Sequence, residues 1–163
     1  MNKDTKVLNR LTISRHDLEQ CQNFLQQLAH QEYGSITYEA LLIAAIVFYA
    51  RPFSNNERGK NANADSKIND EVLDQLTRGE QELHERLLTL RNKAIAHAEW
   101  TYHPTGVSKS GIIKSMPFSI WKDFPHHSRE IAAFSTLVGK ILLRAHHLTA
   151  DKLRQIEFPL TKR

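Results

Sequence analysis

Three side chains near the middle of the chain, Arg91, Asn92 and His97, have the types and spacing that phosphodiester chemistry needs. Arginine carries a permanently charged, planar fork that suits phosphate. Histidine is the side chain whose ordinary pKa lies closest to neutral pH, so it is suited to proton transfer. Asparagine can orient either group by hydrogen bonding. Together these residues offer charge stabilisation and proton transfer without a metal ion.

An apolar pattern with helical period leads into these residues. Its members recur at spacings of three, four and seven: Leu73, Leu76, Leu83, Leu87, Leu90 and Ala94. The pattern predicts a helix over residues 69–100 with one buried stripe. Gly79 lies inside that range and is disfavoured in a helix interior, so it marks a bend or a break between two helices.

The spacing between Arg91 and His97 raises a geometric problem. Six residues along a regular α-helix rise about 9 Å and end about 240° further around the axis. The two side chains therefore do not lie on one face of a regular helix. Long side chains, a local kink or a second chain must bring them to one substrate.

The order Arg-Asn, four residues, then His, near the end of a long helix, resembles the signature of the HEPN superfamily. That family's pattern is Arg, four to six residues, then His, often with a polar residue directly after the Arg. Arg91, Asn92 and His97 match it position by position. The resemblance covers about residues 14–149. It implies an all-α, HEPN-like bundle of four to five helices that forms a homodimer with one composite cleft, to which Arg91 and His97 can come from different chains.

The resemblance also implies a function. Many members are metal-independent endoribonucleases of toxin–antitoxin, phage-defence or RNA-processing systems, so the expected partners are RNA, a second copy and an antitoxin protein. His97 would act as base on the RNA 2′-hydroxyl or as acid on the leaving 5′-oxygen. Arg91 would stabilise the pentacovalent phosphate, and Asn92 would orient the histidine or the phosphate. DNA lacks the 2′-hydroxyl and is not expected to be cut.

One position departs from a family pattern. HEPN toxins paired with nucleotidyltransferase antitoxins commonly carry Tyr two residues after the His, where this chain has Glu99. Regulation by modification of that Tyr is therefore not expected.

Two alternatives remain open. The first is a non-catalytic HEPN-like module that binds nucleic acid, a nucleotide or a partner protein. The second is a plain helical interaction domain, because Arg and His near a helix C-terminus favour the helix dipole whatever the function. In the second case Arg91 and His97 would be freely replaceable.

Arg51 and Lys93 are candidate substrate-binding cations. Lys93 follows the Arg-Asn pair directly, and its alternative role is that of an ordinary surface charge. Arg51 stands at the end of an apolar segment, in the sequence Arg51-Pro52-Phe53. The alternative for Arg51 is a partner of the helix dipole beside a packing Phe.

Neither a metal ion nor another cofactor is expected. The pairs His126-His127 and His146-His147 suggest metal ligands at first sight. Adjacent side chains point in different directions, however, and no Cys or acidic residue stands at ligand spacing.

The rest of the chain predicts three further helices, over residues 15–31, 38–50 and 129–147. Ser14 and Thr37 are the predicted N-caps of the first two. The second is apolar nearly all round, so we expect it in the core and in a dimer seam. The segments outside these helices are an N-terminal arm (1–13), a mobile polar loop (54–66), an irregular insertion that has a hairpin as one option (101–128) and a basic tail (150–163).

Composition indicates a soluble globular protein. The chain has 163 residues, 40% hydrophobic and 25% charged, which suits one domain over residues 1–163. Its net charge of +4 permits an anionic partner without demanding one. Cys21 is the only cysteine, and the apolar run over residues 40–50 is too short to span a membrane. We therefore expect a cytoplasmic protein with no membrane partner.

Overall fold

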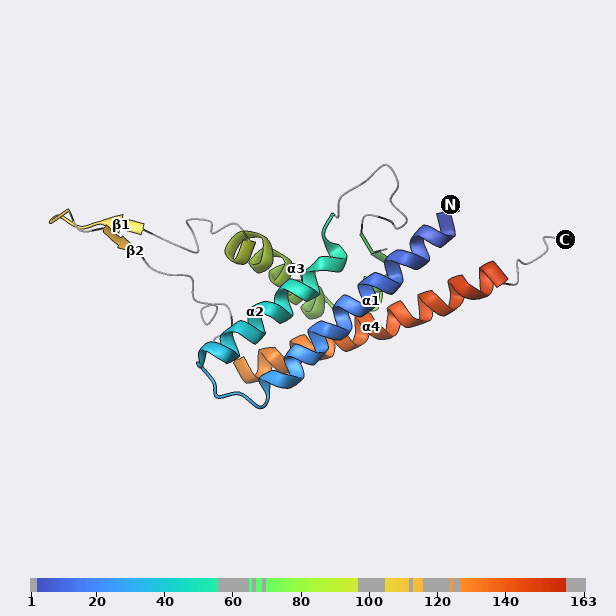
Figure 1. Cartoon of the computed structure of the whole chain (residues 1–163), viewed down its shortest axis with the longest axis horizontal. Helices are drawn as coiled ribbons and strands as arrows, with labels where there is room; N and C mark the ends of the chain where they lie inside the picture. The colour runs from blue at the N-terminus through green and yellow to red at the C-terminus, as the bar shows by residue number, and fades with distance from the viewer. Residues whose placement is uncertain are drawn as a thin grey trace.

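In the computed structural model the chain is an all-α bundle with one small hairpin, as the sequence predicts (Figure 1). The structure describes residues 3–55, 65, 67–68, 70–96, 105–111, 113–115, 124 and 127–157. The elements, in chain order, are α1 (Lys3–Leu28), α2 (Ile36–Ala50), the 3-10 turns η1 (Arg51–Phe53) and η2 (Asp70–Leu73), α3 (Arg78–Thr89), the π-helix η3 (Leu90–Ala96), β1 (Thr105–Val107), β2 (Ile113–Ser115) and α4 (His127–Glu157).

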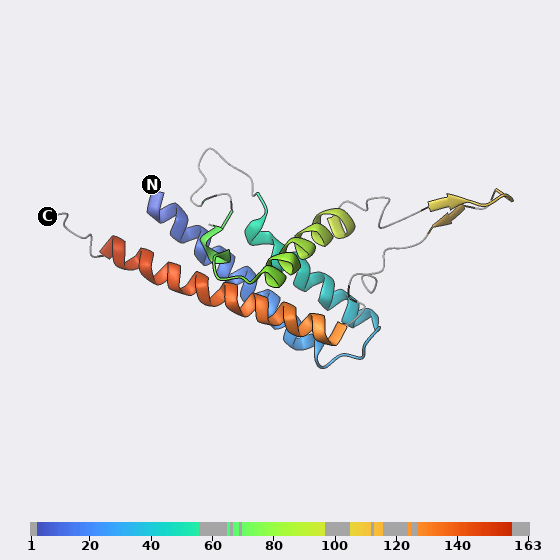
Figure 2. The same ribbon diagram turned by 180° about the vertical axis from the view of Figure 1, so that it is seen from behind.

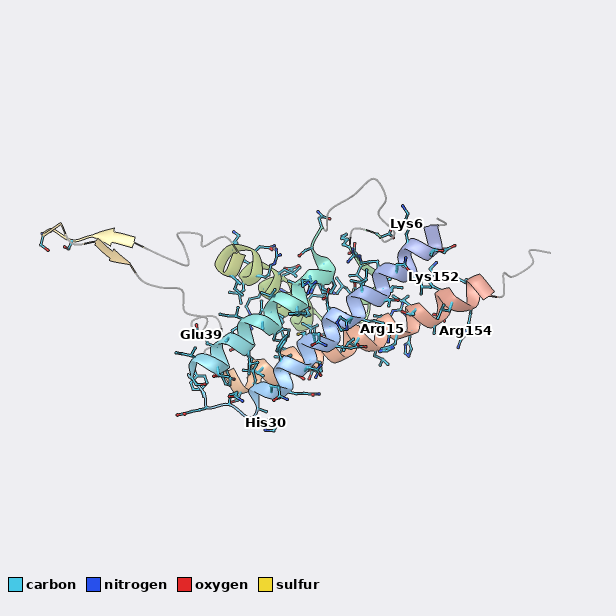
Figure 3. All side chains as sticks on the ribbon, viewed as in Figure 1. Lys6, Arg15, His30, Glu39, Lys152 and Arg154 are labelled. Atoms are coloured by element: carbon cyan, nitrogen blue, oxygen red, sulfur yellow. The ribbon has the colours of Figure 1, made fainter. Side chains whose placement is uncertain are left out.

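The two long helices, α1 and α4, lie side by side and run in opposite directions (Figures 1 and 2). Near the start of α1, Lys152 Nζ lies 3.4 Å from Asp4 Oδ1, and Figure 3 shows Lys152 on the last part of α4. Further along, Gln22 Nε2 donates to Ser135 Oγ at 2.8 Å. These contacts fix the antiparallel register of the pair.

The core forms where α1 packs against α2 on one side and α4 on the other, with α3 and η3 closing it. The fully buried side chains come from all of these elements: Leu18, Leu42, Ile46, Tyr49, Leu87, Leu90, Phe134, Leu137 and Ile141. Burial of such side chains is worth about 1.5–3 kcal/mol each, so this shared core fixes the bundle.

The prediction of an N-terminal arm is wrong for residues 3–13, which form the first three turns of α1. Val7 packs against the core and Leu11 is buried, because α4 extends far enough to cover them. Ser14 is therefore a buried residue inside the helix and not an N-cap. The helix ends at Leu28, somewhat earlier than predicted, and the turn that follows contains Gly34 at φ +80°.

α2 begins two residues earlier than the predicted N-cap Thr37 implied. Its N-cap is Ser35, whose hydroxyl accepts a hydrogen bond from the Tyr38 amide at 3.2 Å. It ends at Ala50, where Pro52 introduces the 3-10 turn η1, as the Arg51-Pro52-Phe53 sequence predicted.

The helix predicted over residues 69–100 is divided in the structure. η2 ends at Leu73, and α3 starts only after Thr77, so Leu73 and Leu76 do not belong to the helix that carries the motif. The break thus precedes Gly79, which lies inside α3. Residues 97–100 lie outside the described residues.

A hairpin is present in the insertion, with β1 and β2 antiparallel around a turn that includes Gly111 at φ +76°. Its strands are Thr105–Val107 and Ile113–Ser115, and both lie within the predicted insertion (101–128). Most of the predicted mobile loop, residues 56–64 and 66, falls outside the described residues.

α4 is longer than the predicted fourth helix and runs to Glu157. The segment predicted as a basic tail, for which a further helical turn was left open, is helical over residues 150–157. Leu148 packs on the core and Thr149 is buried, because α1 also extends further than its polar ends suggested.

Candidate functional site

The candidate motif begins where an α-helix changes into a π-helix. α3 starts with a capping box, in which the Thr77 hydroxyl accepts from the Glu80 amide while the Glu80 carboxylate accepts from the Thr77 amide. From Leu90 to Ala96 the chain continues as the π-helix η3. π-Helical segments are rare, and they occur frequently at functional sites. The described part of the motif, up to Ala96, therefore departs from regular α-helix geometry.

Arg91 and Asn92 are in direct contact on η3. Arg91 Nη1 donates a hydrogen bond to Asn92 Oδ1 at 2.8 Å. Arg91 is half-buried, whereas Asn92 and Lys93 are exposed. Arg91 forms no ion pair with any described residue, so no carboxylate in the described part of the chain neutralises its charge. A guanidinium held in place by an amide oxygen retains further N–H donors for an anion.

Apolar side chains of η3 and of the end of α3 hold the π-helix against the core. Leu87 and Leu90 are buried, and Leu88 and Ile95 pack against the same core. η3 packs on α2, so the backbone that carries Arg91 is fixed against the bundle. His97 and Glu99 lie outside the described residues, and the described part of the motif ends at Ala96.

Arg51 is held by a buried carboxylate. Arg51 Nη1 lies 3.1 Å from Asp17 Oδ1, and the guanidinium stacks over the Phe48 ring with 4.9 Å between Cζ and the ring centroid. Burial raises the pKa of Asp17, and Arg51, followed by His16 and Arg10, opposes that rise. This arrangement favours a structural role for Arg51 at the end of α2 over substrate binding. If Arg51 bound an anion instead, the buried carboxylate of Asp17 would lose its ion-pair partner.

A buried histidine, His84, was missed by the sequence reasoning. The Tyr49 phenol oxygen lies 2.7 Å from His84 Nδ1, and both the Tyr49 and Phe53 rings meet the imidazole edge-on. Burial lowers the pKa of His84, with Glu85 and Asp70 acting in the opposite direction. The sequence feature that indicates burial of His84 is its position three residues before Leu87, on the apolar stripe of the helix.

Arg86 joins α3 to the beginning of α4. Its Nη1 lies 2.8 Å from Glu130 Oε1, and its Cζ lies 5.2 Å from the centroid of the buried Phe124 ring. Together with the Tyr49–His84 contact, this ties the motif helix to two neighbouring helices. The candidate site is thus carried by a segment whose supporting helix is fixed at several points.

The histidine pairs do not form a metal centre in the described part of the chain. His146 and His147 are both exposed on α4, and His126 lies outside the described residues. Among the described residues, no group of three His, Cys, Asp or Glu side chains is placed to hold a metal ion.

α2 carries apolar side chains on two faces, but the bundle covers only one. Its buried residues are Tyr38, Leu42, Ala45, Ile46, Tyr49 and Ala50. The other face holds residues outside the core cluster: Ile36, Ala40, Ala44 and Val47. These four residues, here called the α2 stripe, follow the helical period, and Ile36 is 88% exposed. The prediction that α2 lies in the core is confirmed for one face, and the prediction that it also lies in a dimer seam stays a prediction.

The α2 region also meets the length and composition of a membrane span. The 18 residues Ile36–Phe53 have a mean hydropathy of 1.4, so this segment is longer than the apolar run considered in the sequence. The core helix of a bundle meets the same criterion, and α2 packs against α1, α3 and η3. The segment is therefore weak evidence for a membrane.

Comparisons of the chain with protein-family models, with curated proteins and with solved structures gave no match.

Proposed function

We propose that this protein is a HEPN-like, metal-independent endoribonuclease that works as a homodimer in the cytoplasm, as a toxin or as part of phage defence. The observation that carries the proposal is the Arg91–Asn92 pair, with Nη1 and Oδ1 2.8 Å apart on a solvent-accessible π-helix. Arg91 has no carboxylate partner among the described residues, and Lys93 adds a second cation beside it. The proposal rests on the match of Arg91, Asn92 and His97 to the HEPN pattern.

The proposed reaction is transfer of the scissile phosphate to the neighbouring 2′-oxygen. The 2′-oxygen forms a bond to phosphorus as His97, acting as base, accepts its proton, and the bond from phosphorus to the 5′-oxygen breaks as that oxygen takes a proton from water. In the other role considered for it, His97 donates the proton to the 5′-oxygen and water accepts the proton of the 2′-hydroxyl. Arg91 stabilises the charge on the pentacovalent phosphate, and Asn92 holds the guanidinium in position. The products are a 2′,3′-cyclic phosphate and a 5′-hydroxyl.

In this proposal a second copy docks on the α2 stripe. That stripe lies on the helix against which η3 packs, on the face that the bundle leaves uncovered, so a contact there would join two chains through the helix that supports the motif. Such a contact supplies the second chain that the Arg91–His97 spacing requires. An antitoxin protein that covers the same face would keep the enzyme inactive.

The test of the reaction is cleavage of a labelled RNA in EDTA by the wild type, Arg91→Ala and His97→Ala. Arg78→Ala is the matched control, since Arg78 is an exposed arginine at the other end of the same helix, paired with Glu82 at 3.0 Å. The wild type and control are expected to cut RNA and leave DNA intact, and both motif variants to lose at least 100-fold in rate. RNA that is bound but not cut, with binding lost in Arg91→Ala, would instead favour the non-catalytic HEPN-like module.

The test of the composite site is Ala40→Glu, which places a charge on the exposed α2 stripe. Ala29→Glu is the control, because Ala29 is also exposed but lies in the turn after α1. We expect Ala40→Glu to dissociate the dimer and to abolish cleavage while circular dichroism stays unchanged. A monomeric variant that cuts RNA at the wild-type rate would contradict the composite site.

A further inference from the structure

A pocket of about 280 Å³ lies between the first turns of α1, the turn η2 and the second half of α4. Figure 3 shows this end of the bundle, where Lys152 is labelled on α4 beside the start of α1. One wall of the pocket is apolar. Leu11 is only 2% exposed, and Val7 and Leu148 are partly buried and pack against the core. Three separate elements thus enclose the pocket.

The volume of the pocket suits a small organic molecule. A water molecule takes up about 30 Å³ of the liquid, so 280 Å³ holds about nine waters. A ligand with a similar number of non-hydrogen atoms would replace them. Its aliphatic part would cover the apolar wall and remove that surface from water, which favours binding.

Charged side chains of both signs surround the apolar wall, and two of them already have an opposite charge beside them. Lys152 Nζ lies 3.4 Å from Asp4 Oδ1. Asp151 Oδ1 lies 3.5 Å from Arg154 Nη1. Lys152 and Asp151 line the pocket, so these ion pairs reduce the charge that each of the two offers to a ligand.

Arg144 is the lining cation that has no carboxylate partner among the described residues. Its Nε donates a hydrogen bond to the backbone carbonyl of Glu71 at 3.3 Å, which ties the guanidinium to η2. The two Nη groups remain as donors. A guanidinium presents such donors in a planar fork that matches the two oxygens of a carboxylate.

We propose that this pocket binds a small carboxylate with a short aliphatic body. The carboxylate accepts two hydrogen bonds from the Nη groups of Arg144, and the aliphatic body lies against Leu11 and Leu148. A phosphate is disfavoured, since its second negative charge would be repelled by the carboxylates of Glu71 and Asp151 at the same pocket.

The pocket is separate from the candidate ribonuclease site. η3 packs on α2, and no described residue of η3 lines the pocket. The binding proposal therefore does not depend on the ribonuclease proposal, and its tests use no RNA.

Two sources share the chemistry of the ligand. A fatty acid such as hexanoate offers only the carboxylate and the chain. An aliphatic amino acid such as leucine adds an ammonium group, which the carboxylates of Glu71 and Asp151 at the exposed rim would attract. Hexanoate and leucine are therefore the two probes.

NMR titration of the ¹⁵N-labelled full-length chain with each probe tests the site. We expect at least one probe to bind with a dissociation constant on the order of 1 mM or tighter. The amide shifts should be centred on the first turns of α1, on η2 and on residues 144–155. Tighter binding of hexanoate identifies a fatty acid as the source, and tighter binding of leucine identifies an amino acid. Absence of a saturable shift at this end of the bundle up to about 20 mM of both probes would overturn the proposal.

A series of chain lengths tests the apolar wall. Each buried methylene group strengthens binding about fourfold, so hexanoate should bind about 15-fold more tightly than butanoate. If leucine is the tighter probe, it should exceed alanine by at least the same factor. Equal affinities along the series would mean that the ligand meets only surface charge, which contradicts the proposed pocket.

Substitution of Arg144 tests the carboxylate contact. Arg144→Gln should weaken binding of the tighter probe at least tenfold, and Arg144→Lys should weaken it less, because the charge remains while the fork is lost. Arg129→Gln is the control, since Arg129 is an exposed arginine near the start of the same helix. Thermal melting checks that the variants stay folded. Affinity that is unchanged in both Arg144 variants would rule out the assigned contact.

Discussion

The phenol oxygen of Tyr49 lies 2.7 Å from Nδ1 of His84, and this buried contact joins α2 to α3 two helical turns before Arg91. Both rings are almost fully removed from water. Burial favours the neutral imidazole and so lowers the pKa of His84, although the nearby carboxylates of Glu85 and Asp70 oppose this shift. One of the contacts that join the motif helix to α2 thus involves a histidine whose neutral form is favoured.

Stability is expected to fall as the pH drops below the ordinary histidine pKa of 6.5. Because the pKa of His84 is lower in the folded state, the unfolded chain binds the proton first, and protonation favours unfolding over the window just below pH 6.5. The contribution is fully present above that value. Urea unfolding at pH 7.5 and 5.5 measures it, with His84→Gln beside His146→Gln as an exposed control. Equal pH dependence in the wild type and His84→Gln would contradict the assignment.

Tyr49→Phe should destabilise the chain by about 1–2 kcal/mol. The substitution keeps the packing of the ring but removes the hydroxyl and leaves His84 Nδ1 without its partner. Tyr38→Phe is a suitable control, since Tyr38 lies at the opposite end of α2. Denaturant unfolding at pH 7.5 gives the difference, and a loss no larger than in the control would contradict a structural role for the hydrogen bond.

Arg51→Gln should cost about 1–2 kcal/mol of stability, and Asp17→Asn in the same chain should restore most of it. Asp17 is nearly buried, so it loses its counter-charge in the single variant and no longer needs one in the double variant. The cost is smaller than for a fully buried pair because Arg51 is half exposed.

The same pair of variants separates the two roles considered for Arg51. If Arg51 only neutralises Asp17, the double variant cuts RNA at the wild-type rate once its fold is restored. A double variant that is stable but slow, or that has a raised KM, would indicate that Arg51 also contacts the substrate.

Asn92→Ala should slow RNA cleavage about tenfold without changing the melting temperature, because Asn92 is exposed and its oxygen positions Arg91 Nη1. Arg91→Lys should cost more, about 100-fold, since an ammonium group cannot reproduce the two-pronged contact with a phosphate. Single-turnover cleavage with saturating enzyme measures both, and Arg78→Lys controls for loss of positive charge. A larger effect from Asn92→Ala than from Arg91→Lys would contradict the proposed roles.

The sequence was sufficient for the helical class and for several boundaries because these depend on local chemistry. The period of the leucines and isoleucines specifies helices, Pro52 ends α2, and the turn with Gly34 separates α1 from α2. A hairpin in the insertion was also predicted as an option, and in the structure its turn includes Gly111, which adopts a positive φ without strain.

The ends of α1 and α4 were missed because each stabilises the other. The first turns of α1 and the last turns of α4 carry mostly polar residues, so neither has a strong helical pattern alone. Side by side, they bury Leu11 and Thr149 and place Lys152 near Asp4. Tertiary contact overrides weak local preference in such segments.

In the candidate site, too, some features follow from the sequence and others only from the tertiary structure. The sequence alone establishes which chemistry is available to Arg91, Asn92 and His97, because it depends on the residue types. The π-helix at Leu90–Ala96, the Asp17 partner of Arg51 and the Tyr49 partner of His84 depend on which helices lie together. Those partners are 34 and 35 positions apart in the chain, and no local spacing rule reaches that far, so only packing of the bundle determines them.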